Sequence, residues 1–332
     1  MSGPSTLGRP TITALVTAYN AQDHIADTLR SILAQTCPPD EIVVVDDGST
    51  DGSADVVRTF GDRVRMVWQP NAGHAPALNR GYRESRCDYV AQCDADDLWE
   101  PDKLERQLAA LERHPEIDIH FTGVWIFGAV EGPWGILDGP CAEGGLLDPV
   151  EFARALYQVN SVCPSTTLVR RSLYERLGPY AEELPFVDYH YWFRSLRAGA
   201  TFYYDPHVTV RYRRHDQQMT ANALKMWRSM HDVRTEFGEL VDDDLRRTIR
   251  GADLFRIGRL LADLDDAAAG RAAFWGSARA TTRRTLGTGA RALAWTGLLT
   301  LPGGARDRLT RAAVGASRGL DAARGGRDPA LP

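Results

Sequence analysis

Several features that would assign this chain of 332 residues to a class of proteins are missing from it. No apolar run reaches the roughly 18 residues that a membrane-spanning helix needs, so we expect no such helix. The first ten residues hold no hydrophobic core of the kind found in secretory signal peptides, so we expect no signal peptide. Lysine occurs only at Lys103 and Lys225, whereas arginine is abundant. We attribute that imbalance to genomic bias and not to function.

Neither the cysteines nor the net charge defines a function. The chain has an odd number of cysteines and no C-x-x-C pair: Cys37, Cys87, Cys93, Cys141 and Cys163. This argues against a disulfide framework and against structural zinc, and favours a reducing compartment such as the cytoplasm. The formal net charge is −5, so nothing in the overall charge indicates a nucleic-acid partner. The length suits one large domain or two.

Short apolar runs alternate with amphipathic segments through the first 105 residues. The runs predict strands at 11–16, 41–45, 64–68 and 89–91. A helix is expected between the first two strands, capped by Asp23 and with Ile25, Leu29, Ile32 and Leu33 on one face. Such alternation indicates βαβ units with right-handed crossovers and a parallel sheet. Further along we expect strands at 117–127, 165–169, 201–204 and 208–212, helices at 149–159, from 171 and from 186, and a Gly- and Pro-rich excursion at 128–145.

Three carboxylates follow the fourth predicted strand, in the stretch Cys93-Asp94-Ala95-Asp96-Asp97-Leu98-Trp99. Crowded carboxylates repel one another unless a cation lies among them, and Mg²⁺ binds one or two carboxylates together with substrate phosphates. The alternative is an acidic turn that caps a helix beginning at Pro101. Asp46 also follows an apolar strand, so Asp46 and Asp96 should lie at one edge of the sheet. Ligands bind there in open α/β sheets, which favours a metal–diphosphate site.

Four stretches together resemble glycosyltransferase family 2, whose members have the GT-A fold. They are Val16-Thr17-Ala18-Tyr19-Asn20, Val44-Val45-Asp46-Asp47-Gly48-Ser49-Thr50-Asp51, the pattern Asn71, Gly73, Ala77-Leu78-Asn79, Gly81, and the D-x-D motif Asp94-Ala95-Asp96-Asp97 with Trp99 and Pro101. A fainter match continues to about residue 220 through Asp188, Trp192, Arg194 and Tyr212-Arg213-Arg214-His215.

The resemblance implies an α/β fold of the GT-A type, a Rossmann-like mixed sheet flanked by helices, with a C-terminal helical extension. Residues 1–220 would form the catalytic domain, with a nucleotide-sugar half to about 105 and an acceptor half from 106. Residues 221–320 would be helical and 321–332 a disordered tail. The implied activity is inverting, metal-dependent transfer of a sugar from a UDP- or dTDP-sugar to an acceptor, which could be a glycan, a lipid-linked sugar, a peptide or a natural product.

The resemblance also implies roles for individual residues. Thr17, Tyr19 and Asp46 would hold the nucleobase, Asp94 would lie near the ribose and metal, Asp96 would bind Mg²⁺ or Mn²⁺, Asp188 would be the general base, and His215 with Arg213 or Arg214 would approach the diphosphate, His215 also as a metal ligand. Donor contacts are further expected from Asn71, Gly73, Asn79 and Ala95. A metal acts as a Lewis acid on the leaving diphosphate, and a carboxylate removes the acceptor's proton.

One position departs from the family pattern, because many relatives have Glu-Asp where this chain has Val187-Asp188. Val187 makes the surroundings of Asp188 less polar, which could raise its pKa, or else the base is another residue. Among the histidines, His74 is expected to be a solvated loop residue, with a donor contact as the alternative. His190 could line the acceptor side. No ligand-like spacing joins the others: His24, His114, His120, His207 and His231.

The last part of the chain is basic. From Arg271 onward there are 11 Arg, 3 Asp and no Glu or Lys, which gives a local charge of +8, and Trp275 and Trp295 accompany the arginines. One interpretation is contact with an anionic membrane surface or a partner. The preferred one is helices packed on the catalytic domain, which could also serve as a dimer surface.

Two other functions stay open at this point. A nucleotidyltransferase should carry a Gly-rich, basic loop early in the chain, and 17–23 has neither glycine nor Lys or Arg. A non-catalytic sugar-nucleotide or glycan-binding protein is supported only by Val187. A dehydrogenase is disfavoured because no G-x-G-x-x-G follows the first strand.

Overall fold

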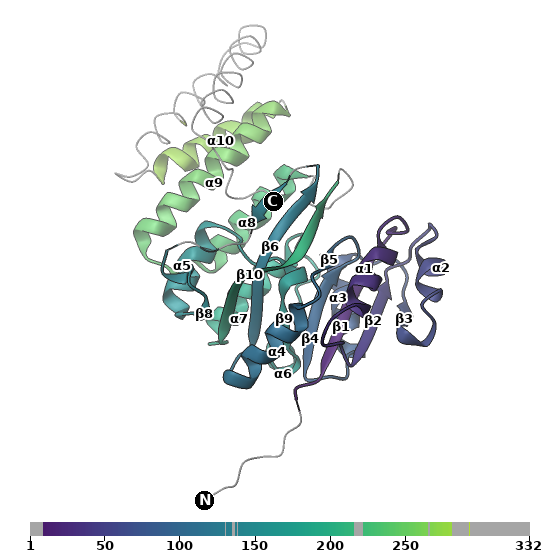
Figure 1. The fold of residues 1–332 in the computed structure, drawn as a ribbon. Coiled ribbons are helices and arrows are strands. Elements are labelled where there is room, and N and C mark those ends of the chain that lie inside the picture. Colours follow the sequence, from purple (N-terminus) through teal and green to yellow (C-terminus); the bar gives the residue numbers. More distant parts are fainter. Residues whose placement is uncertain are drawn as a thin grey trace, which may run out of the picture. The chain divides into compact units, whose positions relative to one another are not determined.

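The computed structural model describes residues 9–129, 131–134, 137, 139–215, 222–264, 266–280 and 292. The chain forms two compact units (Figure 1). The first comprises Met1–Leu156 and Asn160–Asp216, and the second comprises Tyr157–Val159 and Gln217–Pro332. The predicted tail at 321–332 and most of the basic segment lie outside the described residues. No helix in the described ranges is long and apolar enough to cross a membrane.

The first unit is a single sheet with helices on its faces (Figure 1). Its strands are β1 (Ile12–Ala18), β2 (Glu41–Asp46), β3 (Arg65–Trp68), β4 (Tyr89–Asp94), β5 (Leu98–Trp99), β6 (Ile119–Gly128), β7 (Gly132–Trp134), β8 (Gly145–Leu146), β9 (Leu168–Arg170) and β10 (Phe202–Arg214). Its helices are α1 (Ile25–Leu33), α2 (Ser53–Arg58), α3 (His74–Glu84), α4 (Lys103–Arg113), α5 (Pro149–Gln158), α6 (Arg171–Leu177) and α7 (Val187–Arg197).

The strands follow the order β3-β2-β1-β4-β9-β6-β10-β5. The first four are parallel, as the βαβ pattern predicts. β9 then runs antiparallel to both β4 and β6, and β10 runs parallel to β6. The sheet is therefore mixed, and its parallel half is the part that carries the recognised sequence motifs.

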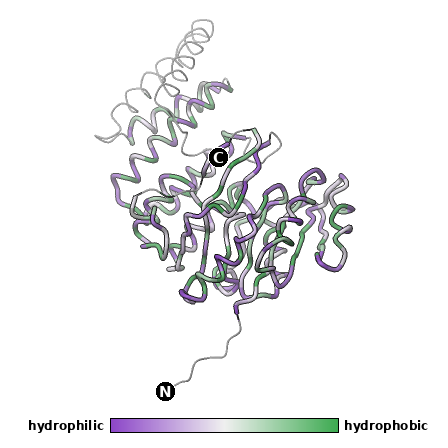
Figure 2. The backbone as a smooth tube through the Cα atoms, in the orientation of Figure 1, coloured by the Kyte–Doolittle hydropathy of each residue, from purple (hydrophilic) through white to green (hydrophobic). Residues whose placement is uncertain are grey.

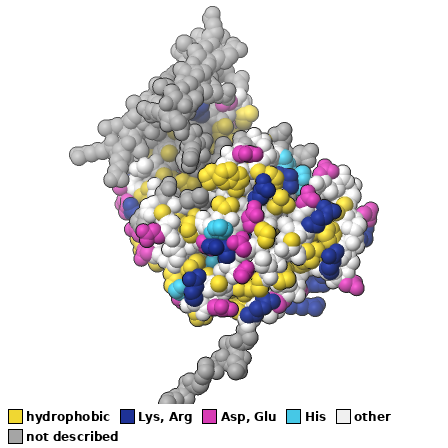
Figure 3. Space-filling view, viewed as in Figure 1, with side chains coloured by type: hydrophobic (Ala, Val, Ile, Leu, Met, Phe, Trp, Pro, Cys, Tyr) yellow, Lys and Arg dark blue, Asp and Glu magenta, His cyan; other side chains and the backbone are white. Residues whose placement is uncertain are grey.

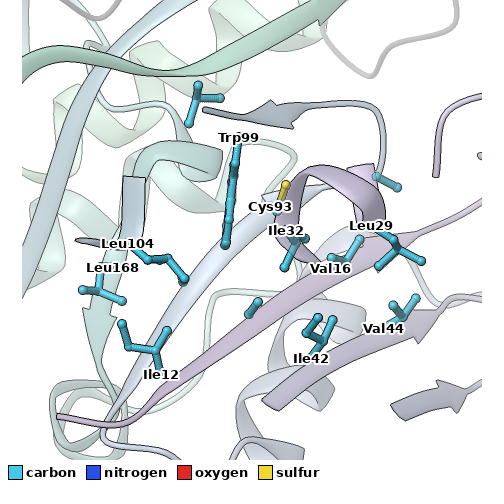
Figure 4. Close-up of a cluster of buried hydrophobic side chains, with 14 of the residues drawn as sticks. Ile12, Val16, Leu29, Ile32, Ile42, Val44, Cys93, Trp99, Leu104 and Leu168 are labelled. Atoms are coloured by element: carbon cyan, nitrogen blue, oxygen red, sulfur yellow. The ribbon is translucent and has the colours of Figure 1, made fainter. Parts of the chain in front are cut away.

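Each face of the parallel half is covered by helices. Val16 and Val44 point to the face where Leu29 of α1 packs, and all three side chains are fully buried (Figure 4). Burial of a side chain of this size contributes about 1.5–3 kcal/mol. On the opposite face, Leu15 meets α3 at Gly81, where an added Cβ would lie 2.2 Å from a Leu15 methyl carbon. Glycine therefore lets α3 lie close against β1.

Three local predictions were wrong. Asp23 does not cap α1, because the N-cap is His24 and it makes no side-chain capping bond. The residues expected to form two strands before and after Pro206 form one strand, β10, with register shifts between Asp205 and Val208 and between Val208 and Val210. Proline has no N–H to donate to the ladder, so β10 bulges there and then continues. Pro164–Thr166 forms a 3-10 turn, so β9 begins only at Leu168.

The second unit is helical, with α8 (Ala223–Glu236), α9 (Asp243–Asp263) and α10 (Ala267–Arg279). Asp242 caps α9, because its side chain accepts a hydrogen bond from the Leu245 N–H at 2.9 Å. Hydrophobic and hydrophilic residues both occur along α9 and α10 (Figure 2), and α9 buries Phe255, Ile257 and Leu261. Acidic and basic side chains are interspersed over the visible surface of the first unit (Figure 3).

Candidate active site

The recognised acids lie at the carboxyl ends of β2 and β4, the two strands on either side of β1. In the sheet register, Ala18 of β1 pairs with Asp46 of β2, and Thr17 of β1 pairs with Asp94 of β4. Because adjacent strands are about 4.8 Å apart, Asp46 and Asp94 lie on the order of 10 Å from each other across the end of β1. The chain reverses its direction of progress across the sheet between β1 and β4. Open α/β sheets bind their ligands at such a switch point.

The loops that follow β1 and β2 are bonded to each other. Asn20 has a φ of 50°, a left-handed conformation that asparagine tolerates. Its N–H donates to Ser49 Oγ at 3.0 Å, and its Oδ1 accepts from the Thr50 N–H at 2.8 Å. This pairing fixes the backbone on one side of the site.

Asp47 fixes the loop that follows β3. Its carboxylate accepts from the N–H groups of Ala72 and Gly73, at 3.0 and 2.8 Å, and from Gln69 Nε2 at 2.7 Å. Gly48, at a φ of 74°, lies so close to this loop that an added Cβ would be 2.6 Å from the Asn71 nitrogen. The Asp47 carboxylate therefore joins the end of β2 to the loop after β3 by hydrogen bonds within the protein.

Asp46 carries an unpaired acceptor. Its side chain is only 2% exposed, and its Oδ1 accepts from the Ser49 N–H at 2.9 Å. Oδ2 is buried and has no hydrogen-bond partner among the described residues. A buried acceptor without a donor costs about 1–3 kcal/mol. The neighbouring Tyr19, after the end of β1, is 53% exposed. The pair offers a ligand one acceptor and one aromatic face.

The acidic turn between β4 and β5 is joined to the end of β10. His215 Nε2 lies 2.9 Å from Asp96 Oδ2, and Arg213 Nε donates to the backbone oxygen of Asp96 at 3.0 Å. Asp97 is fully buried and accepts from Ser165 Oγ at 2.5 Å and from the Arg213 N–H at 3.0 Å. Asp97 thus ties the segments together, while Asp96 and His215 form a pair. Neither Asp94, Asp96 nor Asp97 caps α4, whose N-cap is Asp102, so the alternative of a capping turn is wrong.

A shared electrostatic environment surrounds Asp94. Burial raises the pKa of Asp94 to about 7, and the carboxylates of Asp96 and Asp188 add to this rise. Burial also raises the pKa of Asp188, against the opposing effect of His74. For His74, burial lowers the pKa, while Asp188, Asp47 and Asp96 act in the opposite direction. Asp188, in the first turn of α7, therefore lies within electrostatic reach of Asp94 and His74.

The donor set fits a hard divalent cation that is completed by substrate. Among the described residues, no group of three or more His, Cys, Asp or Glu side chains is placed to hold a metal ion. Asp96 and His215 together supply one carboxylate oxygen and one imidazole nitrogen. Mg²⁺ and related ions complete their shells with phosphate oxygens and water, so two protein ligands suffice. Burial is the main cause of the raised pKa of Asp94, and a bound cation would relieve the repulsion that Asp96 and Asp188 add to it.

Several predicted donor contacts face the protein in the structure. Asn79 is fully buried, and its amide bonds to the Tyr180 N–H and C=O at 2.8 and 3.0 Å and to Glu182 Oε1 at 2.9 Å. The amide thus links α3 to the segment that leads into α7. Ala95 is buried, and its carbonyl accepts from Thr28 Oγ1 at 2.8 Å. Asn71 is exposed in the loop after β3.

Two histidines have a more central place than the sequence indicated. His74 is not a solvated loop residue, since it is the first residue of α3, is half-buried and interacts with Asp188. The His24 ring centroid lies 5.3 Å from that of His215. His24 follows β1 and His74 follows β3, each by a few residues. This position after a strand of the parallel half was the signal in the sequence that could have placed them near the site. His190 is buried within α7.

Comparison with known proteins gives a consistent result. Residues 13–178 match the family described as Glycosyl transferase family 2. The chain is 28% identical over 217 residues to an uncharacterized glycosyltransferase of Rickettsia typhi, a match that covers 65% of this chain and 67% of that protein. It is 39% identical over 104 residues to TuaG of Bacillus subtilis, named as a teichuronic acid biosynthesis glycosyltransferase, over 30% of this chain and 41% of TuaG.

Solved structures share the fold. TarS residues 1–349 from S. aureus, in complex with UDP-GlcNAc, gives a TM-score of 0.65 at 16% identity and covers 86% of this chain and 88% of that chain. The mannosyltransferase PcManGT from Pyrobaculum calidifontis, in complex with GDP-Man and Mn²⁺, gives 0.56 at 20% identity over 90% and 86%. These likenesses confirm the predicted α/β fold of the GT-A type.

Proposed function

Because this chain belongs to glycosyl transferase family 2, we propose that it transfers a sugar, with inversion, from a nucleotide-diphosphate donor to an acceptor nucleophile. The observation that carries the proposal is the group of charged side chains around Asp94 at the end of β4: Asp96 and His215, which pair at 2.9 Å, and Asp188 of α7, whose carboxylate adds to the rise in the pKa of Asp94. Carboxylates that lie close together in a half-buried site repel one another, and this repulsion lowers stability unless a cation and a polar substrate bind there.

The donor base is uracil or thymine. Asp46 has one carboxylate oxygen bonded to Ser49 and the other unpaired, so it can accept one further N–H. Uracil and thymine present one imide N–H between two carbonyls. Guanine presents two neighbouring N–H donors, which suit a carboxylate with both oxygens open. The UDP-GlcNAc in the TarS structure agrees with a uridine donor.

Asp96 and His215 would hold Mg²⁺ or Mn²⁺, and the ion would supply Lewis-acid neutralisation of the charge that develops on the leaving nucleotide. Arg213 places its guanidinium beside the same turn and can add a charge-assisted hydrogen bond to phosphate. Asp94 would accept a hydrogen bond from the ribose.

Asp188 removes the proton of the acceptor as it attacks. It stands in the first turn of α7, and its pKa is raised by burial. Val187, only 3% exposed, is buried beside it. A carboxylate with a raised pKa is a stronger base than an ordinary aspartate. A single displacement of this kind inverts the anomeric centre.

The test is incubation of the full chain with UDP-, dTDP- and GDP-sugars, with and without Mn²⁺, followed by measurement of nucleotide release. We expect slow donor hydrolysis that requires the metal and favours uridine or thymidine donors. Tight binding without release would instead indicate a non-catalytic sugar-nucleotide-binding protein. Release of pyrophosphate from a nucleoside triphosphate and a sugar phosphate would indicate a nucleotidyltransferase. We expect the reaction in the cytoplasm, and the acceptor is to be identified by product analysis.

A further inference from the structure

Trp68 is the last residue of β3, the edge strand of the parallel half, and its side chain is 59% exposed. In the sheet register Trp68 is the direct partner of Asp46. Trp68 is therefore the neighbour, across the strand pair, of the residue whose buried Oδ2 is unpaired among the described residues. Neighbouring strands are about 4.8 Å apart, which is close enough for one small planar ligand to touch both side chains.

The register also fixes the face to which Trp68 points. Partners in a parallel pair project to the same face of the sheet, and residues alternate between faces along a strand. Met66, two residues before Trp68, packs against the core on the α1 and α2 side. Arg65 points the other way and bonds to Glu84 at the end of α3. Trp68 and Asp46 therefore project to the same side.

A nucleobase needs two kinds of contact, an edge that forms hydrogen bonds and a face that is covered. Asp46 supplies the edge contact, and Tyr19, which follows the opposite neighbour of β2, supplies one exposed aromatic ring. Trp68 flanks Asp46 from the other side. Stacking of the base on an aromatic side chain contributes binding free energy, and it does not require a further hydrogen bond to the base.

We propose that Trp68 is a donor-binding residue that covers the face of the nucleobase while Asp46 accepts its N–H. This assignment rests on the proposed function, since it presumes a nucleotide donor. It adds a residue from β3 to a subsite that the sequence motifs place only on β1 and β2. Trp68 contacts only the base, so it should govern donor affinity and not the rate of transfer.

The experiment is calorimetric titration of the full chain with UDP and with UMP in the presence of Mn²⁺. Trp68→Ala should weaken both ligands by a similar factor of about 5- to 140-fold, since both carry the same base. Trp68→Phe should keep most of the affinity. The matched control is Trp275→Ala, which removes a tryptophan that is 50% exposed on α10 of the second unit. Because Trp68 is exposed, its replacement should leave the thermal unfolding transition unchanged.

Failure of this inference differs from failure of the proposed function. If the unmodified chain binds UDP and Trp68→Ala binds it within twofold of the same affinity, the role of Trp68 is overturned and the function stands. A loss of UDP affinity with UMP affinity retained would also overturn it, because the effect would then act on the diphosphate. If the unmodified chain binds neither UDP, dTDP nor GDP with Mn²⁺, the proposed function itself is wrong.

Discussion

Replacement of Asp188 by asparagine removes the proposed base and keeps its shape. The amide has the same size as the carboxylate but cannot take up the acceptor's proton. Burial raises the pKa of Asp188, so the folded protein binds its proton more tightly than the unfolded chain does. The deprotonated carboxylate therefore lowers the unfolding free energy at neutral pH, and a neutral asparagine should leave the protein at least as stable. Loss of activity cannot then be assigned to unfolding.

The expected loss of turnover in Asp188→Asn follows from the proposed role of Asp188 as the general base. A positioned general base contributes about 10²- to 10⁴-fold to the rate, which is roughly 3–5 kcal/mol of the barrier. In the proposed site the donor contacts belong to Asp46, Asp96 and His215, so the donor KM should change little. In the unmodified chain, activity should fall as the pH drops through the raised pKa of Asp188, above its ordinary 3.8. This acid limb should be absent from whatever activity the variant retains.

The assay is release of UDP from the preferred sugar nucleotide in the presence of Mn²⁺, measured from pH 4 to 9. The matched control is Asp62→Asn, which changes an exposed aspartate in the turn before β3. This turn lies at the amino end of β3, whereas the site lies at the carboxyl ends of the parallel strands. Asp62→Asn should behave like the unmodified chain throughout. Turnover of Asp188→Asn within threefold of the unmodified chain would remove Asp188 from the mechanism.

Three further predictions concern the site and its frame. Asp96→Ala should abolish the dependence of UDP affinity on Mn²⁺ in calorimetry, because His215 alone is a poor site, and an unchanged dependence would contradict the metal assignment. In metal-free buffer, the unfolding free energy should fall by up to about 4 kcal/mol from pH 4 to 8, because folded Asp94 has a pKa of about 7 and unfolded Asp94 one near 3.8. Asp94→Asn should flatten that slope in urea denaturation, and an identical slope would contradict it. Asn79→Ala should lower the unfolding free energy by about 2–3 kcal/mol, because the backbone groups of Tyr180 lose buried partners. Unchanged stability with lost UDP affinity would make Asn79 a donor ligand instead.

Local signals in the sequence located the parallel half of the sheet. A strand buried on both faces is a continuous apolar run, and β2 and β4 have that form. Each run ends in acids, so their common edge was predictable from the βαβ pattern alone. The antiparallel position of β9 between β4 and β6 could not be predicted in this way. Its three residues show no alternation of polar and apolar side chains, and its partner strands lie far away in sequence.

Some features of the candidate site could likewise be predicted from the sequence, and others could not. The contact of Asp96 with His215 joins residues 119 positions apart, so spacing could not reveal it, and only the family resemblance placed them together. Asn79 illustrates the opposite case. It belongs to a recognised motif, yet its partner Tyr180 is 101 positions away, and only the fold shows that its amide bonds within the protein.

The most direct test of the central claim is anomalous diffraction from a crystal soaked with UDP and Mn²⁺. We predict a manganese peak bound by Asp96 and His215, with the diphosphate oxygens completing its shell and the uracil edge on Asp46. Uridine diphosphate bound elsewhere, or a manganese peak away from Asp96, would contradict the claim that these carboxylates hold a cation for the departing nucleotide.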